Sequence, residues 1–405
     1  MVSIAIMGHG VVGSGVAEIF TTHKQKLYAS IGEEVYVKKI LDLREFPDSP
    51  LADRFTKNFE DIINDLEIRV VVEVMGGLNP AYDFVKRCLK AGKSVVTSNK
   101  ELVAKKGAEL LKIAHEKGVN FFFEASVGGG IPIIRPLHQC LSANRIDEIA
   151  GILNGTTNFI LTMMIEEGMS FEEALKIAQE KGYAEKDPTA DVEGHDACRK
   201  VCILASLAFG KHVYPNQVET EGITNISLED VSYIENAGGV IKLLGQIKYI
   251  NDNEIAAFVS PAVVYNGSQL ASVKDVFNAI LVRGDAVGDV CFYGPGAGKL
   301  PTASAVVADI IDCAKHSDRK KIFGWGEGSE NYVVDYKEKI EMPFYVRAKA
   351  TPNEVNSKFA DVKFLSRKGQ PSDEVAFITD YMTENKLNKK LDGMNVINTI
   401  KVTNY

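Results

Sequence analysis

The sequence predicts an α/β protein with three parts: a doubly wound parallel sheet domain, an α+β domain, and a small C-terminal α+β domain. Three observations support this prediction. Apolar runs alternate with helical patterns over the first third of the chain, the first run meets a glycine cluster, and the alternation then ends. We expect domains over 1–135, 136–300 and 342–405, a linker over 316–341, and a helix over 301–315 that packs back on the first domain.

Composition limits the classes of function. The chain has 405 residues, 45% of them hydrophobic, which suits two or three domains. Its formal charge of −8 is spread along the chain, which argues against nucleic acid or an anionic membrane as partner. No apolar run reaches the ~20 residues of a membrane span, and no export signal follows Met1. We therefore expect a cytoplasmic protein.

The six cysteines lie in apolar contexts, which favours reduced thiols. Cys198 and Cys202 lie four apart on a predicted helix and could hold a metal ion. Because no paired Cys or His set accompanies them, buried thiols are the favoured interpretation.

The N-terminal stretch combines an apolar strand, a glycine-rich turn and a helix start. Gly8 makes the turn, Gly10 lets the backbone approach a pyrophosphate, and Gly13 lets helix and strand pack closely. The N–H groups of the helix start face the phosphate charge. A plain tight turn is the alternative, but the position at the first strand favours a Rossmann-type dinucleotide site that includes Val11 and Val12.

A second strand is expected over 34–43, with Asp42 near its end. A carboxylate there accepts hydrogen bonds from ribose hydroxyls and repels a 2′-phosphate, which favours NAD over NADP. Arg44 could pair with a 2′-phosphate, and a turn role for Asp42 stays an alternative. The separation from Gly13 exceeds the usual ~20 residues, which an insertion around 24–34 would explain.

Two more parallel strands are expected to end at the cofactor crevice. The apolar run 69–77 closes with two glycines, so Gly76 is placed at the crevice. The strand 94–97 leads into a polar turn that ends at Lys100. A lysine at this position points to the ligand-binding edge of an open α/β sheet, although a solvated lysine is the common alternative.

A further apolar strand carries one carboxylate, Glu124, into a glycine-rich loop at 127–131. Hard cations prefer oxygen ligands, so Glu124 and nearby backbone carbonyls form a candidate cation site. The spacing of these residues alone does not decide between a cation site and an ordinary glycine-rich loop.

After the alternation ends, polar residues cluster around a second site. The turn 154–158 can cap its own helix or bind a ligand. The loop 182–196 contains five carboxylates and leads into a helix on which Asp196 and Lys200 lie four apart. As a bare pair they are structural. In the functional interpretation, Glu185 and Asp196 accept hydrogen bonds from a substrate ammonium or hydroxyl while Lys200 handles a proton.

The region 212–293 combines helical patterns with strands expected at 254–265 and 278–287. These strands look antiparallel and are expected to form a second sheet that could carry a subunit contact. Another glycine-rich turn at 293–299 then opens the helix 301–315.

From Gly8 to about Lys315 the chain resembles homoserine dehydrogenase. Seven motifs follow the family's order: 8–15, 72–77, 97–100, 123–132, 154–158, 182–200 and 294–304. The resemblance implies NAD(P)-dependent interconversion of L-homoserine and L-aspartate 4-semialdehyde, in threonine, methionine and isoleucine biosynthesis, by a homodimer or tetramer.

The resemblance also implies residue roles. Lys100 would lie between substrate and nicotinamide, and Lys200 would be the catalytic proton donor or acceptor. The substrate would be held by Glu185 and Asp196, with Thr156 and Gly182 nearby. A monovalent cation, usually sodium, would be bound by Glu124 and the carbonyls of Val127, Gly129 and Ile131. The cofactor would contact Gly8, Gly10, Val11, Val12, Gly13, Asp42, Arg44, Gly76, Thr97, Ser98, Lys100, Gly182, Gly296 and Gly298.

Two features depart from the family pattern. Many members carry Val-Arg-Asp after the second strand, where this chain has Leu41-Asp42-Leu43-Arg44; we expect NAD to be preferred. The order of elements over 342–405 resembles a β-α-β-β-α-β ACT domain, but the segment 351–361 has room for only one or two helical turns. We expect a degenerate ACT-like domain without clear threonine regulation.

Two alternative functions are another amino-acid dehydrogenase or reductase, and a dinucleotide-sensing protein without chemistry.

Overall fold

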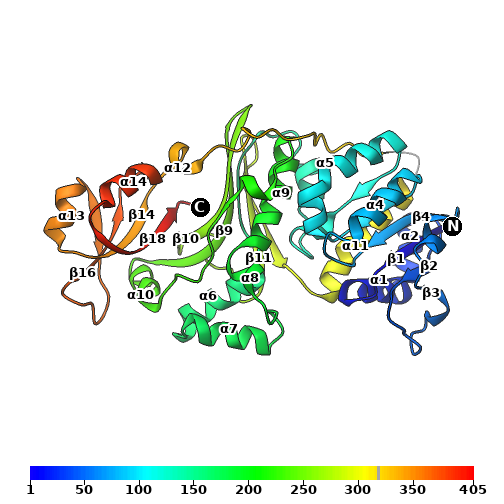
Figure 1. The fold of residues 1–405 in the computed structure, drawn as a ribbon, viewed down its shortest axis with the longest axis horizontal. Coiled ribbons are helices and arrows are strands. Elements are labelled where there is room, and N and C mark those ends of the chain that lie inside the picture. Colours follow the sequence, from blue (N-terminus) through cyan, green and yellow to red (C-terminus); the bar gives the residue numbers. More distant parts are fainter. Residues whose placement is uncertain (317–319) are drawn as a thin grey trace. The chain divides into compact units, whose positions relative to one another are not determined.

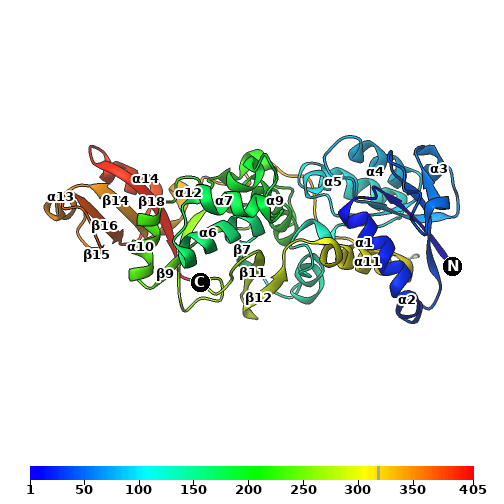
Figure 2. The same ribbon diagram turned by 90° about the horizontal axis from the view of Figure 1, so that it is seen from below.

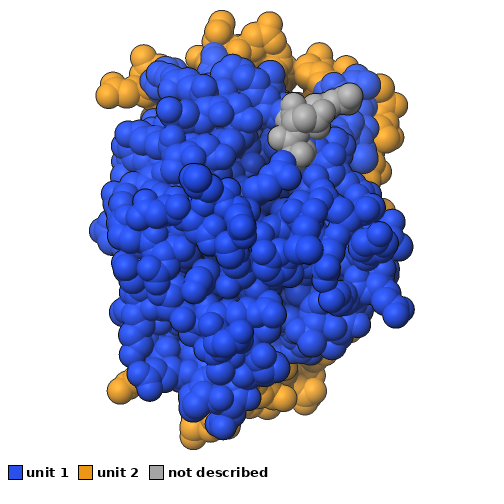
Figure 3. Space-filling view, turned by 90° about the vertical axis from the view of Figure 1, so that its right-hand side faces the viewer, with its two compact units in different colours: residues 1–144, 202–215, 294–329 blue, residues 145–201, 216–293, 330–405 orange. Residues whose placement is uncertain are grey.

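The computed structural model describes residues 1–316 and 320–405, so part of the expected linker 316–341 lies outside the described residues. The chain divides into two compact units, each built from three segments (Figure 3). Unit 1 comprises 1–144, 202–215 and 294–329, and unit 2 comprises 145–201, 216–293 and 330–405.

Unit 1 contains a six-stranded parallel sheet in the order β3-β2-β1-β4-β5-β6. Its apolar, β-branched central strands are buried, as is typical of a sheet covered on both faces. The doubly wound parallel sheet predicted from the sequence is therefore confirmed. The strands are β1 (Val2–Met7), β2 (Val35–Leu41), β3 (Phe55–Thr56), β4 (Ile68–Glu73), β5 (Ser94–Thr97) and β6 (Phe121–Phe122).

Helices cover both faces of this sheet, with α1 and α11 on one side and α4 and α5 on the other (Figure 1). Helices α1 and α11 approach closely because Gly15 has no side chain: a Cβ there would lie 2.8 Å from the Lys299 carbonyl oxygen. Helix α2 occupies the place of the expected insertion. The helices are α1 (Val11–Thr22), α2 (Lys24–Ile31), α3 (Glu60–Ile63), α4 (Ala81–Lys90), α5 (Lys100–Lys117) and α11 (Lys299–Lys315).

Unit 2 contains a mixed sheet in the order β12-β11-β7-β9-β10-β18-β14-β16-β15, with β8 beside β10. The α+β character predicted for this region is confirmed. The strands are β7 (Ile146–Ile152), β8 (Glu219–Thr220), β9 (Gly239–Asn251), β10 (Glu254–Tyr265), β11 (Phe277–Gly284), β12 (Gly288–Pro295), β14 (Phe344–Lys349), β15 (Val362–Leu365), β16 (Glu374–Thr379) and β18 (Asn395–Thr403).

The single strand predicted over 278–287 was wrong at its C-terminal end. The chain turns after Gly284 and returns as β12, and the left-handed φ of +74° at Gly288 is compatible with that turn.

Helices of unit 2 pack against this sheet (Figure 2). They are α6 (Gly155–Glu167), α7 (Phe171–Glu180), α8 (Thr189–Val192), α9 (His195–Phe209), which continues into unit 1, α10 (Leu228–Asn236), α12 (Tyr336–Lys339), α13 (Pro352–Lys358) and α14 (Glu384–Leu391). A two-stranded sheet pairs β13 (Glu341–Met342) with β17 (Met382–Thr383). Over the described ranges, no helix is both long and apolar enough to cross a bilayer.

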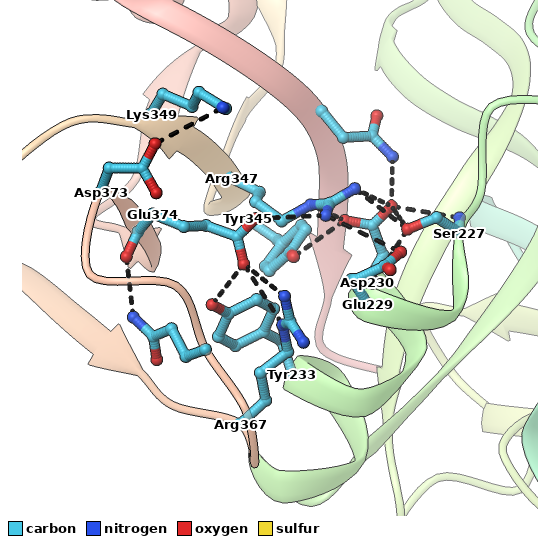
Figure 4. A network of polar contacts seen from close by, with 12 residues as sticks. Ser227, Glu229, Asp230, Tyr233, Tyr345, Arg347, Lys349, Arg367, Asp373 and Glu374 are labelled. Carbon is cyan, nitrogen blue, oxygen red and sulfur yellow. Dashed lines mark hydrogen bonds and ion pairs between the residues drawn. The ribbon is translucent and has the colours of Figure 1, made fainter.

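A buried polar network joins α10 to the C-terminal strands (Figure 4). Arg347 of β14 lies 2.8 Å from Asp230 of α10, and the Tyr345 hydroxyl donates to the same carboxylate at 2.9 Å. The Tyr233 hydroxyl donates to Glu374 of β16 at 2.8 Å. The C-terminal segment is thus fixed to unit 2 by paired, desolvated side chains as well as by strand pairing.

Candidate active site

The glycine-rich turn of unit 1 has the geometry that its motif predicts. Gly8 has a φ of +100°, and a Cβ on Gly13 would lie 1.9 Å from the Gly8 carbonyl oxygen, so no side chain fits there. A Cβ on Gly10 would meet no described atom within 4 Å, which leaves open space at the start of α1. Val11 is exposed at this turn, whereas Val12 packs partly against the core.

Asp42 lies directly after β2, beside the glycine turn. Its carboxylate accepts from the His9 backbone N–H at 2.7 Å and from the Arg44 Nε and Nη2 at 3.0 and 2.9 Å. The hydrogen bond from the Arg44 side chain lowers the pKa of Asp42, so the group stays ionised. The two residues predicted to decide cofactor choice are therefore paired with each other.

A cavity of about 310 Å³ adjoins this pair. Its walls include Asp42, Arg44, Phe46, Phe55 and Lys57. Aromatic and charged groups together suit a ligand with a flat ring and a polar sugar.

The ends of β4 and β5 are joined by a buried hydrogen-bond network. The Thr97 hydroxyl donates to Glu73 at 2.6 Å and accepts from the Asn99 N–H at 2.9 Å. Glu73 also accepts from the Gly76 N–H at 3.3 Å, and burial raises its pKa. Gly76 and Thr97 are thereby held at the carboxyl ends of β4 and β5, Ser98 follows, and α5 begins at Lys100.

The predicted cation loop lies against the second glycine-rich turn. A Cβ on Gly129 would lie 2.3 Å from the Gly296 carbonyl oxygen, and Gly298, with a φ of +126°, precedes α11. Glu124 is buried and accepts from the N–H groups of Ile133, Ile134 and Arg135 at 2.7–2.9 Å. Its carboxylate thus stabilises the start of the next helical segment.

The loop also supplies main-chain oxygens. Among the described residues, no hydrogen bond ends on the carbonyl oxygen of Val127, Gly129 or Ile131, although all three residues are buried. Buried carbonyls are normally paired, so these oxygens are compatible with an added cation. No group of three or more His, Cys, Asp or Glu side chains within residues 1–316 and 320–405 is arranged to hold a metal ion.

In unit 2, Lys200 and Asp196 form a buried ion pair on α9. The Lys200 Nζ lies 2.7 Å from Asp196 Oδ2 and donates to the Leu153 carbonyl oxygen at 2.5 Å. Only 10% of the Lys200 side chain and 4% of the Asp196 side chain are exposed. The predicted one-face spacing is confirmed, and the pair is desolvated, unlike an ordinary surface helix pair.

Asn154 caps its own helix, one of the two alternatives that the sequence left open for its turn, and it also contacts two carboxylates. Its Oδ1 accepts from the Thr157 N–H at 2.8 Å and caps α6. Its Nδ2 donates to Asp196 at 2.9 Å and to Asp191 at 2.7 Å. The start of α6 is therefore joined to both carboxylates.

The other predicted substrate residues lie along the same loop. The Thr156 hydroxyl donates to the Tyr183 carbonyl oxygen at 2.7 Å, which places the loop at the start of α6. Gly182 is exposed with a φ of +74°. Glu185 is exposed, and its backbone carbonyl accepts from the Gln179 side chain. The structure does not place the Glu185 carboxylate beside Lys200.

Sequence reasoning missed three contributors: the Leu153 carbonyl, the bridging amide of Asn154, and Asp191. Asn154 had a signal, since an asparagine before a helix is a common cap. Asp191 was one of five carboxylates in the loop, and only the folded chain shows which of them Asn154 selects. A buried lysine beside a carboxylate can take up a proton from a bound hydroxyl as the neutral amine and release one as the ammonium.

Comparison with known proteins places both units in one group. The model described as the NAD binding domain of homoserine dehydrogenase matches residues 8–124, and the model described as homoserine dehydrogenase matches residues 132–311. The homoserine dehydrogenase of Bacillus subtilis (strain 168) is 44% identical over 318 residues, which cover 78% of this chain and 73% of that protein.

Solved structures agree. A homoserine dehydrogenase from Thiobacillus denitrificans superposes with a TM-score of 0.90 at 35% identity, covering 100% of this chain and 98% of that one. A hyperthermophilic archaeal homoserine dehydrogenase mutant in complex with NADPH gives a TM-score of 0.66 at 29% identity, covering 78% and 98%. The first likeness includes the C-terminal segment.

Proposed function

The chain belongs to the homoserine dehydrogenase family, and on that premise we propose which of its residues carry the reaction. The enzyme is an oxidoreductase with an NAD(P)-binding domain. Its substrates are L-homoserine and L-aspartate 4-semialdehyde in this proposal, and its pathways are those of threonine, methionine and isoleucine synthesis.

Oxidation of homoserine removes a hydride from the alcohol carbon and a proton from the hydroxyl. The nicotinamide, when bound, supplies the hydride acceptor. The Lys200 Nζ, as the neutral amine, takes the hydroxyl proton, and as the ammonium it returns that proton in the reverse direction. Asp196 and the Leu153 carbonyl hold Nζ in place and stabilise its charged form. Asp196 and Glu185 would hold the substrate, with Thr156 and Gly182 beside them, and Lys100 is the second proposed catalytic residue.

The buried Lys200–Asp196 pair is the observation that carries this proposal. It is tested by mixing the full-length protein with L-homoserine and either NAD or NADP and following the absorbance of the reduced nicotinamide. We expect reduction with at least one cofactor. Reduction with another amino alcohol but none with homoserine would contradict the substrate assignment.

We propose NAD as the preferred cofactor. Asp42 is fixed at the strand end by the His9 N–H, and its charge would repel a 2′-phosphate. To neutralise that phosphate, Arg44 would have to leave its two hydrogen bonds to Asp42 and lose side-chain entropy. The remaining proposed cofactor contacts are the glycines of the two turns, Gly8, Gly10, Gly13, Gly296 and Gly298, and the residues Val11, Val12, Gly76, Thr97, Ser98, Lys100 and Gly182.

We propose a sodium site at Glu124 and the carbonyls of Val127, Gly129 and Ile131. The carbonyl oxygens without hydrogen bonds, noted above, support it, because a hard cation would satisfy them. The thermal stability of the protein in sodium chloride should exceed that in choline chloride at equal ionic strength. The same difference in the Glu124→Gln variant would contradict the proposed ligand set.

Three broader features are also proposals. The order β14-α13-β15-β16-α14-β18 supports an ACT-like segment, and α13 has only seven residues, which supports its degenerate character. The buried thiols of Cys88 and Cys313 support a reducing compartment such as the cytoplasm. A homodimer or tetramer is proposed from the family resemblance.

A further inference from the structure

A cavity of about 150 Å³ lies within unit 2 between strands of the mixed sheet and the C-terminal segment. Side chains of β7, β9 and β11 form one wall: Glu148, Gln246, Lys248 and Arg283. The other wall consists of Glu341, whose carboxylate is paired with Lys386 at 2.9 Å, Met342, Pro343, Tyr381 and the segment 402–405. The two walls come from parts of the chain that are far apart in sequence.

The cavity lies on the opposite face of β9 from Lys200. Successive residues of a strand point to opposite faces of its sheet. A Cβ on Gly245 would lie 2.5 Å from Val201 of α9, so Gly245 faces the helix that carries Lys200. Gln246 therefore points away from that helix and into the cavity. The cavity is distinct from the proposed substrate site.

Three charged side chains stand side by side on the strand wall. Glu148 is directly opposite Arg283 on β11 and Lys248 on β9. Its oxygens lie 2.7 Å from Lys248 Nζ and 3.1 Å from Arg283 Nη1, and the Tyr405 hydroxyl donates to it at 2.7 Å. The carboxylate is thus well supplied with donors. Arg283 also donates from Nε and Nη2 to Asp289 at 2.6 and 2.9 Å. Lys248 has three N–H donors and Arg283 has five, so N–H donors remain on both side chains after these contacts.

Gln246 adds an unmet donor that is fully buried. Its Oε1 lies 2.8 Å from the Tyr405 hydroxyl, and its Nε2 has no hydrogen-bond partner among the described residues. Exchanging the two amide atoms does not remove the problem. Nε2 carries two hydrogens and Tyr405 could accept only one of them, so at least one N–H lacks an acceptor in either orientation. A buried unpaired N–H destabilises the fold, unless a bound group accepts it.

We propose that this cavity binds a small carboxylate. Its oxygens would accept from Gln246 Nε2 and from the spare donors of Lys248 and Arg283, and its carbon chain would contact Met342 and Pro343. At about 30 Å³ per water molecule, the cavity has the volume of about five waters. A ligand of about five to eight non-hydrogen atoms would fill that volume. Because both walls contribute, the ligand would bridge the C-terminal segment to the central sheet.

Butyrate is the probe, and butyramide is its neutral control. Isothermal titration of the full chain should give saturable butyrate binding, with much weaker butyramide binding. Gln246→Leu should weaken butyrate at least tenfold, while the same change at the exposed Gln269 should leave it unchanged. Gln246→Leu removes the unpaired amide, so the melting temperature of this variant without ligand should equal or exceed that of the wild type. That measurement shows that the variant folds.

Two results would overturn the proposal. One is the absence of saturable butyrate binding to the wild type. The other is equal affinity in the wild type and in Gln246→Leu, which would place butyrate elsewhere, including the substrate site. Lys248→Met tests the charge independently and should also weaken butyrate without changing the affinity for butyramide.

Discussion

Replacing Lys200 by methionine should abolish most turnover and also destabilise the fold, and the structure allows the two effects to be separated. Methionine has a chain of similar length but no proton to transfer. Loss of a positioned general acid or base lowers rates by a factor of roughly 10²–10⁴, equivalent to about 3–5 kcal/mol of barrier. Turnover of homoserine, followed by reduced nicotinamide, measures this loss.

The stability effect follows from what Lys200 leaves behind. Without Nζ, the Asp196 carboxylate keeps its hydrogen bond from Asn154 but loses its buried counter-charge. Removing one partner of a buried ion pair costs about 3–5 kcal/mol. Urea unfolding of Lys200→Met should therefore show a lower midpoint than the wild type.

The double variant Lys200→Met/Asp196→Asn is the matched control. It removes both charges, so most of the lost stability should return while turnover stays low. Nearly wild-type turnover in Lys200→Met would refute the catalytic role. Recovery of turnover in the stable double variant would show that the single variant was inactive only because it was poorly folded.

Three other variants test separate parts of the molecule. Asp42→Ser removes the charge at the end of β2, so the ratio of kcat/KM for NADP to that for NAD should rise; an unchanged ratio would show that Asp42 does not determine the preference. Burial lowers the pKa of Lys242 from 10.5 to about 8. Between pH 8 and 10.5 the unfolded chain therefore binds a proton on Lys242 that the folded chain has released. The free energy of unfolding should rise by about 3 kcal/mol over this range. Lys242→Met should lack that rise in urea titrations, and the same slope in both proteins would contradict the assignment. Gly13→Ala puts a Cβ 1.9 Å from the Gly8 carbonyl oxygen and should greatly weaken dinucleotide binding in a fluorescence titration, whereas normal affinity would mean that the turn adapts.

Local patterns predicted much of unit 1. The strand 94–97 was placed at its exact bounds, and the glycine turn after β1 has the expected conformation, because each depends on residues close together in the sequence. The left-handed φ at Gly8 and the absent side chain at Gly13 follow from the motif itself.

Long-range pairing was the part that the sequence could not predict. The contact between the His9 N–H and Asp42 joins residues 33 positions apart, and Asn154 selects Asp191 from a loop 37 positions away. No periodicity encodes such choices, because they depend on how complete strands and helices pack. The end of β11 at Gly284 is a different case, because Gly284-Asp285 is a local turn signal; the predicted strand extended past it to the apolar Ala286 and Val287.

The parallel pair between β10 and β18 constrains how this chain can be made. Thr403 donates to the Val263 carbonyl oxygen across 140 positions of sequence. At ~5–20 residues per second on a ribosome, roughly 7–30 s pass between the emergence of one strand and that of its partner. During that interval the edge of β10 at residues 262–264 has no strand from β18 beside it. An open edge of apolar residues can pair with other nascent chains, so this edge of a newly made copy is a potential aggregation site until β18 pairs with it.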